Sequence, residues 1–318
     1  MVQYRKFRND DPPGLAEIWN EAFAGRGAVR LRSSSPLERH VFAKPYFDPD
    51  GLIVALENGV RVGFAHAGFG PNETESRLSH DRGVICLIGL RPSFQRRGIG
   101  AELLQRCDKY LRERGATELH AGAMHPLNPF YFGLYGGSEL PGFLDSDPAT
   151  GPFLRKHGYQ PGAASFIFQR RLDQPFNIAD GRFGAIRRCY EMRLLPQIKL
   201  GTWWQECVLG LVEPVEVRLE EKWTGQAAAT AIAWEMEGFS WRWEAPTVGV
   251  MNLQVREDLR RQGLGKFLMA QLIRHLQEQY FGLVEVQTME SNQAAIKLYT
   301  GLGFQHVDTG RIYRKQTA

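Results

Sequence analysis

The sequence has few cysteines and no long apolar run. Its four cysteines, Cys86, Cys107, Cys189 and Cys207, are scattered along 318 residues, and no two of them form a Cys-x-x-Cys pair. This spacing argues against a disulfide framework and a zinc site, so we expect buried, reduced thiols and no bound metal. No apolar stretch is long enough to span a membrane, and the first ten residues are charged and unlike a secretion signal. We therefore expect a cytoplasmic protein without a membrane partner.

The chain also lacks a strong charge of either sign. Lysine and arginine number 39 against 35 aspartates and glutamates, which leaves a net charge of +4. This small excess suits an anionic ligand, but the arginines gather at only two separate turns and form no basic stripe, so we do not expect nucleic acid as a partner. Neither turn is followed by Gly-Lys-Ser/Thr, which argues against a P-loop nucleotidase.

A strand–turn–helix pattern occurs twice in the sequence. The apolar and β-branched run Val248–Val255 is followed by Arg-Arg-Gln-Gly-Leu-Gly at 260–265 and then by an amphipathic helix. The run Val84–Leu90 stands in the same relation to Gln-Arg-Arg-Gly-Ile-Gly at 95–100. Two copies of one α/β unit account for this repetition better than coincidence does.

The spacing of the two turns sets the expected domain boundaries. The same offset that relates them also aligns the strand predicted at 117–123 with the one predicted at 282–288. We expect an N-terminal domain at 1–172, a linker at 173–184 and a C-terminal domain at 185–318. The first copy also carries extra residues at 125–152, rich in aromatics, glycine and proline. They are too apolar for a disordered linker, so we expect an ordered insertion.

Hydrophobic periodicity predicts most of the remaining elements. In the first copy we expect a strand at 2–8, helices beginning near 12 and 36, a hairpin over 52–69 and a closing strand at 163–172. In the second copy we expect a helix at 202–209, strands at 215–221 and 227–237, a helix at 293–302 and a closing strand at 307–313.

Three aromatic residues of the second copy alternate with polar ones. Phe239, Trp241 and Trp243 are separated by Ser240 and Arg242. Alternation of this kind predicts a strand that places the three rings on one face of a sheet. We expect these rings to pack in a core or an interface rather than to form the wall of a substrate site.

Each glycine turn offers a binding site for a di-anion. A Gly-x-Gly at a strand-to-helix turn leaves backbone amides bare beside the positive end of the helix dipole, and arginines flank it here. Glycine is needed because a Cβ atom would keep phosphate oxygens away from the backbone. The turns therefore predict binding of a pyrophosphate.

These motifs resemble those of the GCN5-related N-acetyltransferase (GNAT) family. Both turns are similar to the family's acyl-CoA signature, Gln/Arg-x-x-Gly-x-Gly/Ala. Residues 292–304, Asn-Gln-Ala-Ala-Ile-Lys-Leu-Tyr-Thr-Gly-Leu-Gly-Phe, are similar to its second signature. Two such domains in one chain resemble mycothiol synthase and related tandem acetyltransferases. The resemblance implies an α/β (α+β) fold class: two tandem GNAT folds, each a mixed, mostly antiparallel central sheet flanked by helices, with one splayed strand pair.

The resemblance also implies where acetyl-CoA would bind. The end of the central strand would pair with the pantetheine arm, the turn would hold the pyrophosphate, and an amide near Leu253 would stabilise the oxyanion. In the second half the expected residues are Leu253, Gln254, Val255, Arg260, Arg261, Gln262, Gly263, Leu264, Gly265, Lys266 and Asn292. In the first half they are Ile88, Gly89, Leu90, Gln95, Arg96, Arg97, Gly98, Ile99, Gly100 and Ala101. The role of Asn292 stays open between a cofactor contact and a helix N-cap.

The same resemblance makes Tyr299 the expected general acid. A phenol and an alkyl thiol have pKa values of about 10 and 8.5, close enough for proton transfer to the leaving thiolate. Leu154 takes the corresponding position in the first half. We therefore expect a catalytic second domain and a first domain that binds acyl-CoA or only supports the fold. Tyr131 or Tyr135 of the insertion is the alternative acid for the first half.

The general base stays open at this point. Some family members carry a glutamate on the central strand, but Gly249 and Val84 occupy that position here. Water relays and a backbone carbonyl are as open as any side chain. The acidic candidates, which the sequence does not rank, are Glu235, Glu237, Glu290, Asp145 and Asp147.

The expected activity is acetyl-CoA-dependent N-acetylation of the primary amine of a small molecule that the sequence does not identify. An antibiotic, an amino acid, a polyamine, a peptide N-terminus and the amine of a thiol-sugar all remain open as acceptors. The alternatives are a catalytically silent acyl-CoA sensor or scaffold, and catalysis in the N-terminal domain. We expect a monomer or weak homodimer, because the tandem domains stand in for a dimer.

Overall fold

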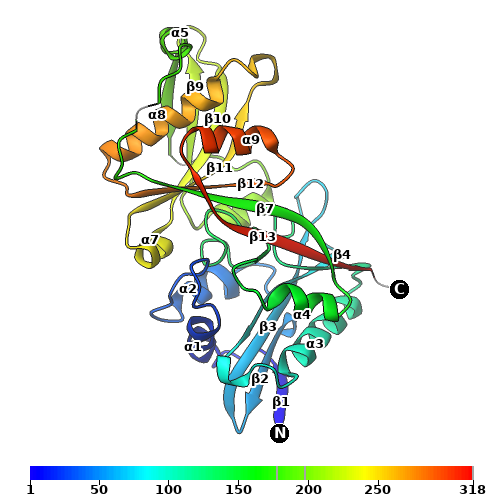
Figure 1. Cartoon of the computed structure of the whole chain (residues 1–318). Helices are drawn as coiled ribbons and strands as arrows, with labels where there is room; N and C mark the ends of the chain where they lie inside the picture. The colour runs from blue at the N-terminus through cyan, green and yellow to red at the C-terminus, as the bar shows by residue number, and fades with distance from the viewer. Residues whose placement is uncertain (177, 197, 317–318) are drawn as a thin grey trace. The chain divides into compact units, whose positions relative to one another are not determined.

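The structure, a computed structural model, describes residues 1–176, 178–196 and 198–316 and divides into two compact units (Figure 1). Asn177 of the expected linker and the last two residues of the expected C-terminal domain lie outside the described residues. Unit 1 comprises Met1–Ser165, Leu200–Leu211 and the segment from Asp308; unit 2 comprises Phe166–Lys199 and Val212–Val307.

The units are not continuous halves of the sequence. The closing strand of the first half, β7 (Gln160–Arg171), belongs to unit 2 from Phe166 onward. The closing strand of the second half, β13 (Gln305–Gln316), belongs to unit 1 from Asp308 onward. Helix α6 (Trp203–Leu209) also belongs to unit 1. Each unit therefore contains segments from both halves of the sequence. The boundaries 1–172 and 185–318 describe the two copies of the repeat, and as domain boundaries they stay a prediction.

Unit 1 is built on a mixed sheet. Its strands follow the order β1-β2-β3-β4-β5-β13, and neighbours are antiparallel except for the parallel pair β4–β5. The β2–β3 hairpin turns at Asn58-Gly59, where both residues have positive φ, as a tight two-residue turn requires. The first five strands are β1 Val2–Lys6, β2 Leu52–Glu57, β3 Val60–Pro71, β4 Leu78–Leu90 and β5 Glu118–Ala121.

The helices of unit 1 match the periodicity of the sequence. Helix α3 (Ile99–Glu113) buries Leu103, Leu104, Cys107 and Leu111 along one face, the stripe that helical spacing predicts. Short 3-10 turns cover Pro49–Gly51 and Pro92–Phe94. The other helices are α1 Pro12–Ala22, α2 Ser35–Leu37 with a π-helical turn at Glu38–Phe42, and α4 Thr150–Lys156.

The aromatic segment at 125–152 packs into unit 1. Tyr131 and Tyr135 are buried. Trp19 of α1 stacks on Tyr131 with ring centroids 5.6 Å apart, and its indole N–H donates to the Val29 carbonyl. The segment contains a two-residue strand, β6 (Phe143–Leu144), which pairs with β13. These residues are therefore a structural part of the unit 1 core.

Unit 2 repeats the architecture of unit 1. Its strands follow the order β8-β9-β10-β11-β12-β7, with antiparallel pairs from β8 to β11 and a parallel pair β11–β12. In Figure 1, α8 and α9 cross in front of these strands. The new strands are β8 Tyr190–Leu195, β9 Val215–Glu221, β10 Ala227–Glu235, β11 Thr247–Val255 and β12 Leu283–Met289. The helices are α5 Phe183–Cys189, α7 Glu237–Trp243, α8 Leu264–Glu278 and α9 Gln293–Gly301, and a 3-10 turn covers Glu257–Leu259.

Both sheets are mixed, mostly antiparallel and flanked by helices, so the predicted fold class is confirmed. One prediction about the elements is wrong. Phe239, Trp241 and Trp243 lie in helix α7, not in a strand. Phe239 and Trp243 are four residues apart and share a helix face, where their rings pack 4.8 Å apart. Trp241 points elsewhere and is 67% exposed. Five residues are too few to separate a strand period of two from a helical period of 3.6, and the ring contact between Phe239 and Trp243 is that of residues four apart on a helix.

Candidate functional site

The parallel strands β11 and β12 of unit 2 pair only at their beginnings. The register runs from Thr247 opposite Leu283 to Val250 opposite Val286, whereas β11 continues to Val255 and β12 to Met289. A bulge with positive φ at Asn252 follows the end of the pairing. The backbone from there to Val255 has no partner on the β12 side among the described strands. These N–H and C=O groups are available to an extended ligand.

The glycine turn joins the end of β11 to α8. Arg261 has φ +65° and Gly263 has φ +90°, a conformation that glycine adopts without strain. The amide of Phe267 makes the first helical bond, to the Gly263 carbonyl, so the amides of Leu264, Gly265 and Lys266 have no acceptor within the helix. Left-handed backbone followed by bare amides forms an anion-binding concavity. The structure thus brings the predicted residues 260–266 together at one turn.

Two cations stand beside this turn. A Cβ atom on Gly263 would lie 2.9 Å from the guanidinium carbon of Arg182, which places that side chain directly against the turn. Asp180 accepts from Arg182 at 2.7 Å and from Lys266 at 3.1 Å. The hydrogen bond from Arg182 is the main reason why the pKa of Asp180 lies well below its usual range, so the carboxylate stays ionised and holds both cations. Arg182 escaped the sequence analysis because Asp180-Gly181 indicated only a linker.

Helix α9 places Asn292 and Tyr299 at its two ends. The Asn292 side chain accepts from the Ala295 amide at 3.1 Å, so it serves as the N-cap. Tyr299 is 5% exposed, and its ring packs against Phe168 of β7 and Phe304. Both rings belong to the core cluster that includes α8. Tyr299 therefore lies on the α8 side of the sheet.

The sequence analysis missed a buried carboxylate on β12. Glu285 is fully buried, lies opposite Gly249 in the β11–β12 register, and accepts from the Gln169 amide at 2.6 Å. Its neighbours Val284 and Val286 belong to the α8 core, so strand alternation directs Glu285 to the opposite face of the sheet. The only signal in the sequence was a glutamate inside a Val-Glu-Val strand, and its place beside Gly249 becomes visible only in the strand pairing.

The acidic residues weighed from the sequence lie elsewhere. Glu235 ends β10, Glu237 begins α7, and Glu290 follows β12; all three are exposed. Asp145 and Asp147 belong to unit 1, where they line a pocket. None of these positions combines burial with a place on the splayed strand pair, and Glu285 does.

Unit 1 repeats the strand splay and the glycine turn. Pairing of β4 with β5 stops at Ile85 opposite Ala121, although β4 continues to Leu90. The turn carries the same conformation, with φ +59° at Arg96 and +82° at Gly98. The predicted residues Ile88–Leu90 and Gln95–Ala101 therefore occupy the same local positions as their counterparts in unit 2.

The strand end is covered in unit 1 and exposed in unit 2. Leu87 and Gly89 are buried, and a Cβ atom on Gly89 would lie 3.1 Å from the ring of Phe23, the C-cap of α1. The corresponding residues of unit 2, Asn252 and Gln254, are exposed. Leu154 of α4, at the position of Tyr299, is fully buried and carries no exchangeable proton.

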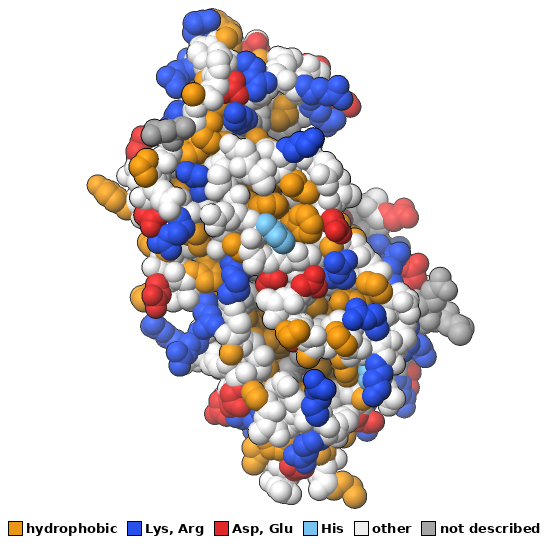
Figure 2. All heavy atoms as spheres, viewed as in Figure 1, with side chains coloured by type: hydrophobic (Ala, Val, Ile, Leu, Met, Phe, Trp, Pro, Cys, Tyr) orange, Lys and Arg blue, Asp and Glu red, His pale blue; other side chains and the backbone are white. Residues whose placement is uncertain are grey.

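The structure does not directly test the expectations about metals, membranes, nucleic acid and oligomeric state. The residues described contain no group of three or more His, Cys, Asp or Glu side chains that could hold a metal ion. None of their helices is long and apolar enough to cross a membrane. On the face that Figure 2 shows, Lys and Arg side chains are interspersed with Asp and Glu. The expectations about nucleic acid and about a monomer or weak homodimer stay predictions.

Known sequences share segments with this chain. It is 29% identical over 119 residues to an acetyltransferase of Pectobacterium atrosepticum, which is 37% of this chain and 74% of that protein. It is 31% identical over 117 residues to the mycothiol acetyltransferase of Propionibacterium freudenreichii, covering 36% of this chain and 35% of that protein. A third match, 37% over 68 residues, is the ribosomal protein bS18 alanine N-acetyltransferase of Escherichia coli, covering 21% of this chain and 46% of that protein. The alignments with the second and third relatives thus span less than half of those proteins.

Solved structures match nearly the whole chain in fold. A tandem GNAT protein from the clavulanic acid biosynthesis pathway superposes with a TM-score of 0.66 at 16% identity, over 99% of this chain and 98% of that one. A GCN5-related N-acetyltransferase from Sphaerobacter thermophilus gives 0.65 at 14% identity, over 99% and 95%. The model of the acetyltransferase (GNAT) family matches residues 14–135 and again residues 188–304. The chain therefore belongs to the GNAT acetyltransferase family, with one family match in each half.

Proposed function

We propose that the chain transfers an acetyl group from acetyl-CoA to the primary amine of a small molecule, and that unit 2 holds the transfer site. The observation that carries this proposal is the exposed end of β11, which lacks a strand partner on its β12 side and has Tyr299 on one side of the sheet and Glu285 on the other. Family membership supplies the reaction class, and these residues supply the assignment to unit 2.

The residues at this strand end suit the parts of coenzyme A. Backbone groups of Leu253–Val255 pair with the amides of the pantetheine arm, as an added strand would. The pyrophosphate binds to the amides of Leu264–Lys266, where Arg182 and Lys266 add positive charge. A side chain on Gly265 would lie 3.2 Å from Val255 and close the space between the strand and the helix.

Acid and base act from opposite faces of the sheet in this proposal. Glu285 takes the proton of the attacking ammonium, so that a neutral amine forms the N–C bond. A backbone amide near Leu253 stabilises the oxyanion. The C–S bond then breaks, and the hydroxyl of Tyr299 gives its proton to the sulfur. The attacking nitrogen loses its second proton as the amide forms, and this proton restores the Tyr299 phenol, so that a neutral amide and a free thiol leave the site. A phenol with a pKa of about 10 is a matched donor for a thiolate whose acid has a pKa of about 8.5.

The direct experiment is a thiol-release assay with acetyl-CoA across a panel of amines, run beside a binding measurement with coenzyme A. The panel contains amino acids, polyamines, amino sugars and peptides with a free N-terminus. We expect tight binding together with release that depends on at least one amine. Binding without amine-dependent release from any panel member would instead identify an acyl-CoA sensor or scaffold and contradict the proposal.

A further inference from the structure

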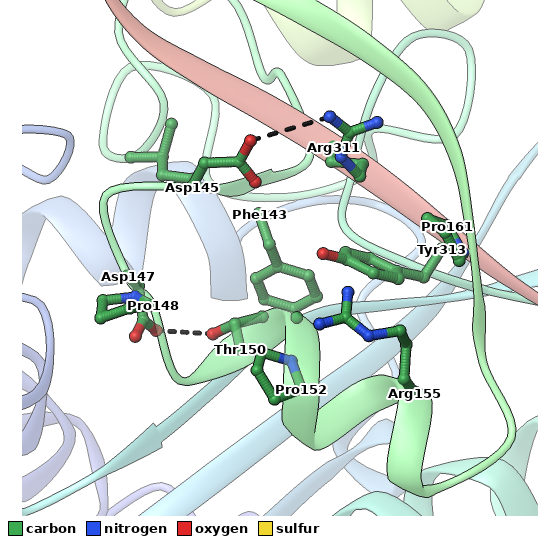
Figure 3. Close-up of a pocket in the computed structure, with 12 residues that line it drawn as sticks. Phe143, Asp145, Asp147, Pro148, Thr150, Pro152, Arg155, Pro161, Arg311 and Tyr313 are labelled. Atoms are coloured by element: carbon green, nitrogen blue, oxygen red, sulfur yellow. Dashed lines mark hydrogen bonds and ion pairs between the residues drawn. The ribbon is translucent and has the colours of Figure 1, made fainter.

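Unit 1 contains a pocket that the proposed transfer site does not use. Its volume is about 480 Å³, in the range of pockets that hold small molecules. Its walls come from β6, the segment leading into α4, α4 itself, the start of β7 and β13, all within unit 1 (Figure 3). Leu154, the counterpart of Tyr299, lies on the same helix but is not among the lining residues. The ligand of this pocket therefore has to be inferred from the pocket's own lining residues.

One end of the pocket offers hydrogen-bond donors to an anion. In Figure 3 the Arg155 guanidinium lies beside the Tyr313 hydroxyl. Both converge on Gly151, because a Cβ atom there would lie 2.9 Å from the Tyr313 oxygen and 3.3 Å from a terminal Arg155 nitrogen. Among the described residues, Arg155 makes no ion pair with a carboxylate. A guanidinium beside a phenol is a strong donor pair for a carboxylate.

The opposite wall carries a carboxylate that is only weakly engaged. Asp145 lies 3.8 Å from Arg311, at the long limit of an ion pair, and its side chain is 48% exposed. Its backbone amide donates to the Thr309 carbonyl at 2.7 Å, which fixes its place on the wall. Asp147, in contrast, accepts from the Thr150 hydroxyl at 2.5 Å and from the Ala149 amide at 3.1 Å. Asp145 is therefore the carboxylate that can pair with a ligand.

The pocket contains charges of both signs and a rigid apolar wall. Phe143 stands between the two charged ends in Figure 3, and prolines at 148, 152 and 161 add surface with little freedom to move. A phosphate or other di-anion would meet the two aspartates, and a polyamine would meet the two arginines. A ligand with one charge of each sign satisfies both ends.

We propose that this pocket binds a small zwitterion with a carboxylate and a primary ammonium, the chemistry of an amino acid. Its carboxylate pairs with Arg155 and Tyr313, its ammonium with Asp145, and its side chain lies on Phe143. The site is a binding site of unit 1, and the proposal does not depend on acetyl transfer in unit 2.

Calorimetric titration of the full chain without acetyl-CoA tests this proposal. Each amino acid of a panel is compared with the amine that lacks its carboxylate and with the acid that lacks its ammonium. We expect at least one zwitterion to bind, and both of its truncated analogues to bind about tenfold more weakly or worse. Absence of binding by every amino acid of the panel contradicts the proposal.

Two substitutions assign the two ends of the ligand. Arg155→Gln is expected to weaken binding at least tenfold, whereas Lys156→Gln, the neighbouring basic residue on α4, leaves it unchanged. Asp145→Asn is expected to erase the preference for the zwitterion over the deaminated acid. If Asp145 only supported the structure, its substitution would lower the affinity for the zwitterion and the affinity for the deaminated acid by the same factor. Equal binding by the wild type and the Arg155 variant, or a retained ammonium preference in the Asp145 variant, would overturn the assignment. Because no acetyl donor is present, this outcome is independent of the thiol-release assay.

Discussion

The two units share a backbone frame and differ in the side chains around it. In both, a parallel strand pair separates after four residues, and a left-handed glycine begins the following helix. In unit 2 the strand end is exposed, Tyr299 lies on one side and Glu285 on the other. In unit 1 the strand end is covered by α1, and Leu154 replaces the phenol.

The backbone that the two units share therefore does not by itself indicate which reaction a unit catalyses. The position of Glu285 is occupied in unit 1 by His120, a buried imidazole whose pKa is lowered chiefly by desolvation. Its neighbour Glu118 contacts it at 3.3 Å. Unit 1 keeps the left-handed glycine turn, packs aromatic rings against the strand end at Gly89, and has a pocket of different character at α4. The same fold can thus carry different sites.

The largest difference between the units should appear when Tyr299 loses its hydroxyl. We expect Tyr299→Phe to lower kcat by about 10²–10⁴-fold with little change in KM for acetyl-CoA, because only the proton transfer is removed. The matched control is Tyr280→Phe, the same change at a tyrosine that is 89% exposed. Steady-state thiol release measures both. Near-normal turnover in the Tyr299 variant would move the acid to another residue or to unit 1.

Substitution of Glu285 should give the next largest effect. We expect Glu285→Gln to lower kcat about 10²-fold at neutral pH. The pH–rate profile of the variant should differ from that of the wild type, because the proposed proton acceptor is lost. His120→Gln in unit 1 serves as the comparison and should change stability more than turnover. An unchanged pH–rate profile in Glu285→Gln would remove this residue from the proton path.

The two turn glycines allow a test with equal local strain. An alanine at Gly263 or at Gly98 costs about 1–2 kcal/mol of backbone energy, because both positions are left-handed. Only at Gly263 would the added Cβ meet Arg182, whereas nothing lies within 4 Å at Gly98. We expect Gly263→Ala to raise KM for acetyl-CoA about tenfold and Gly98→Ala to leave it within twofold. Equal increases would place a productive cofactor site in each unit.

Removal of the Arg182 charge should have a smaller effect on the cofactor. We expect Arg182→Gln to weaken coenzyme A binding several-fold and to reduce its salt dependence, because one cation beside the pyrophosphate is lost. Arg171→Gln provides the control, since Arg171 forms an exposed ion pair with Asp173 in the same unit. If both variants bind equally well at low salt, Arg182 only packs against the turn.

The smallest effect on turnover is expected at Asp11 of unit 1, although stability should fall. Burial raises the pKa of this carboxyl, but the hydrogen bonds from Arg5 and Arg61 outweigh that effect and lower the pKa to about 2. The stabilisation is therefore present above about pH 4, the unfolded value, and is lost as the pH falls through about 2. It amounts to about 2 kcal/mol, so Asp11→Asn should lower Tm at neutral pH and flatten the acid side of the stability profile. An unshifted Tm would contradict this.

Local patterns in the sequence were sufficient for much of the fold. The glycine turns and the helices after them follow from periodicity and spacing, whereas the splayed strand pairs followed only from the resemblance to the family. Of the two roles left open for Asn292, the N-cap of α9 is the one that the structure shows. The exchange of closing strands between the units was not predictable, because alternation in β7 and β13 identifies a face but not a pairing partner. Glu285 and Arg182 were missed for a related reason. Their surroundings, Gly249 and Gly263, are distant in sequence, so only the fold reveals them.

A structure of the protein with coenzyme A bound is the most direct test of the central claim that transfer takes place in unit 2. The account predicts the pantetheine arm along Leu253–Val255, the pyrophosphate on Leu264–Lys266, and the Tyr299 hydroxyl within hydrogen-bond distance of the sulfur. Glu285 should lie on the opposite side of the thiol end. Coenzyme A bound only at Gly98–Ala101, or a Tyr299 hydroxyl directed away from the sulfur, would contradict it.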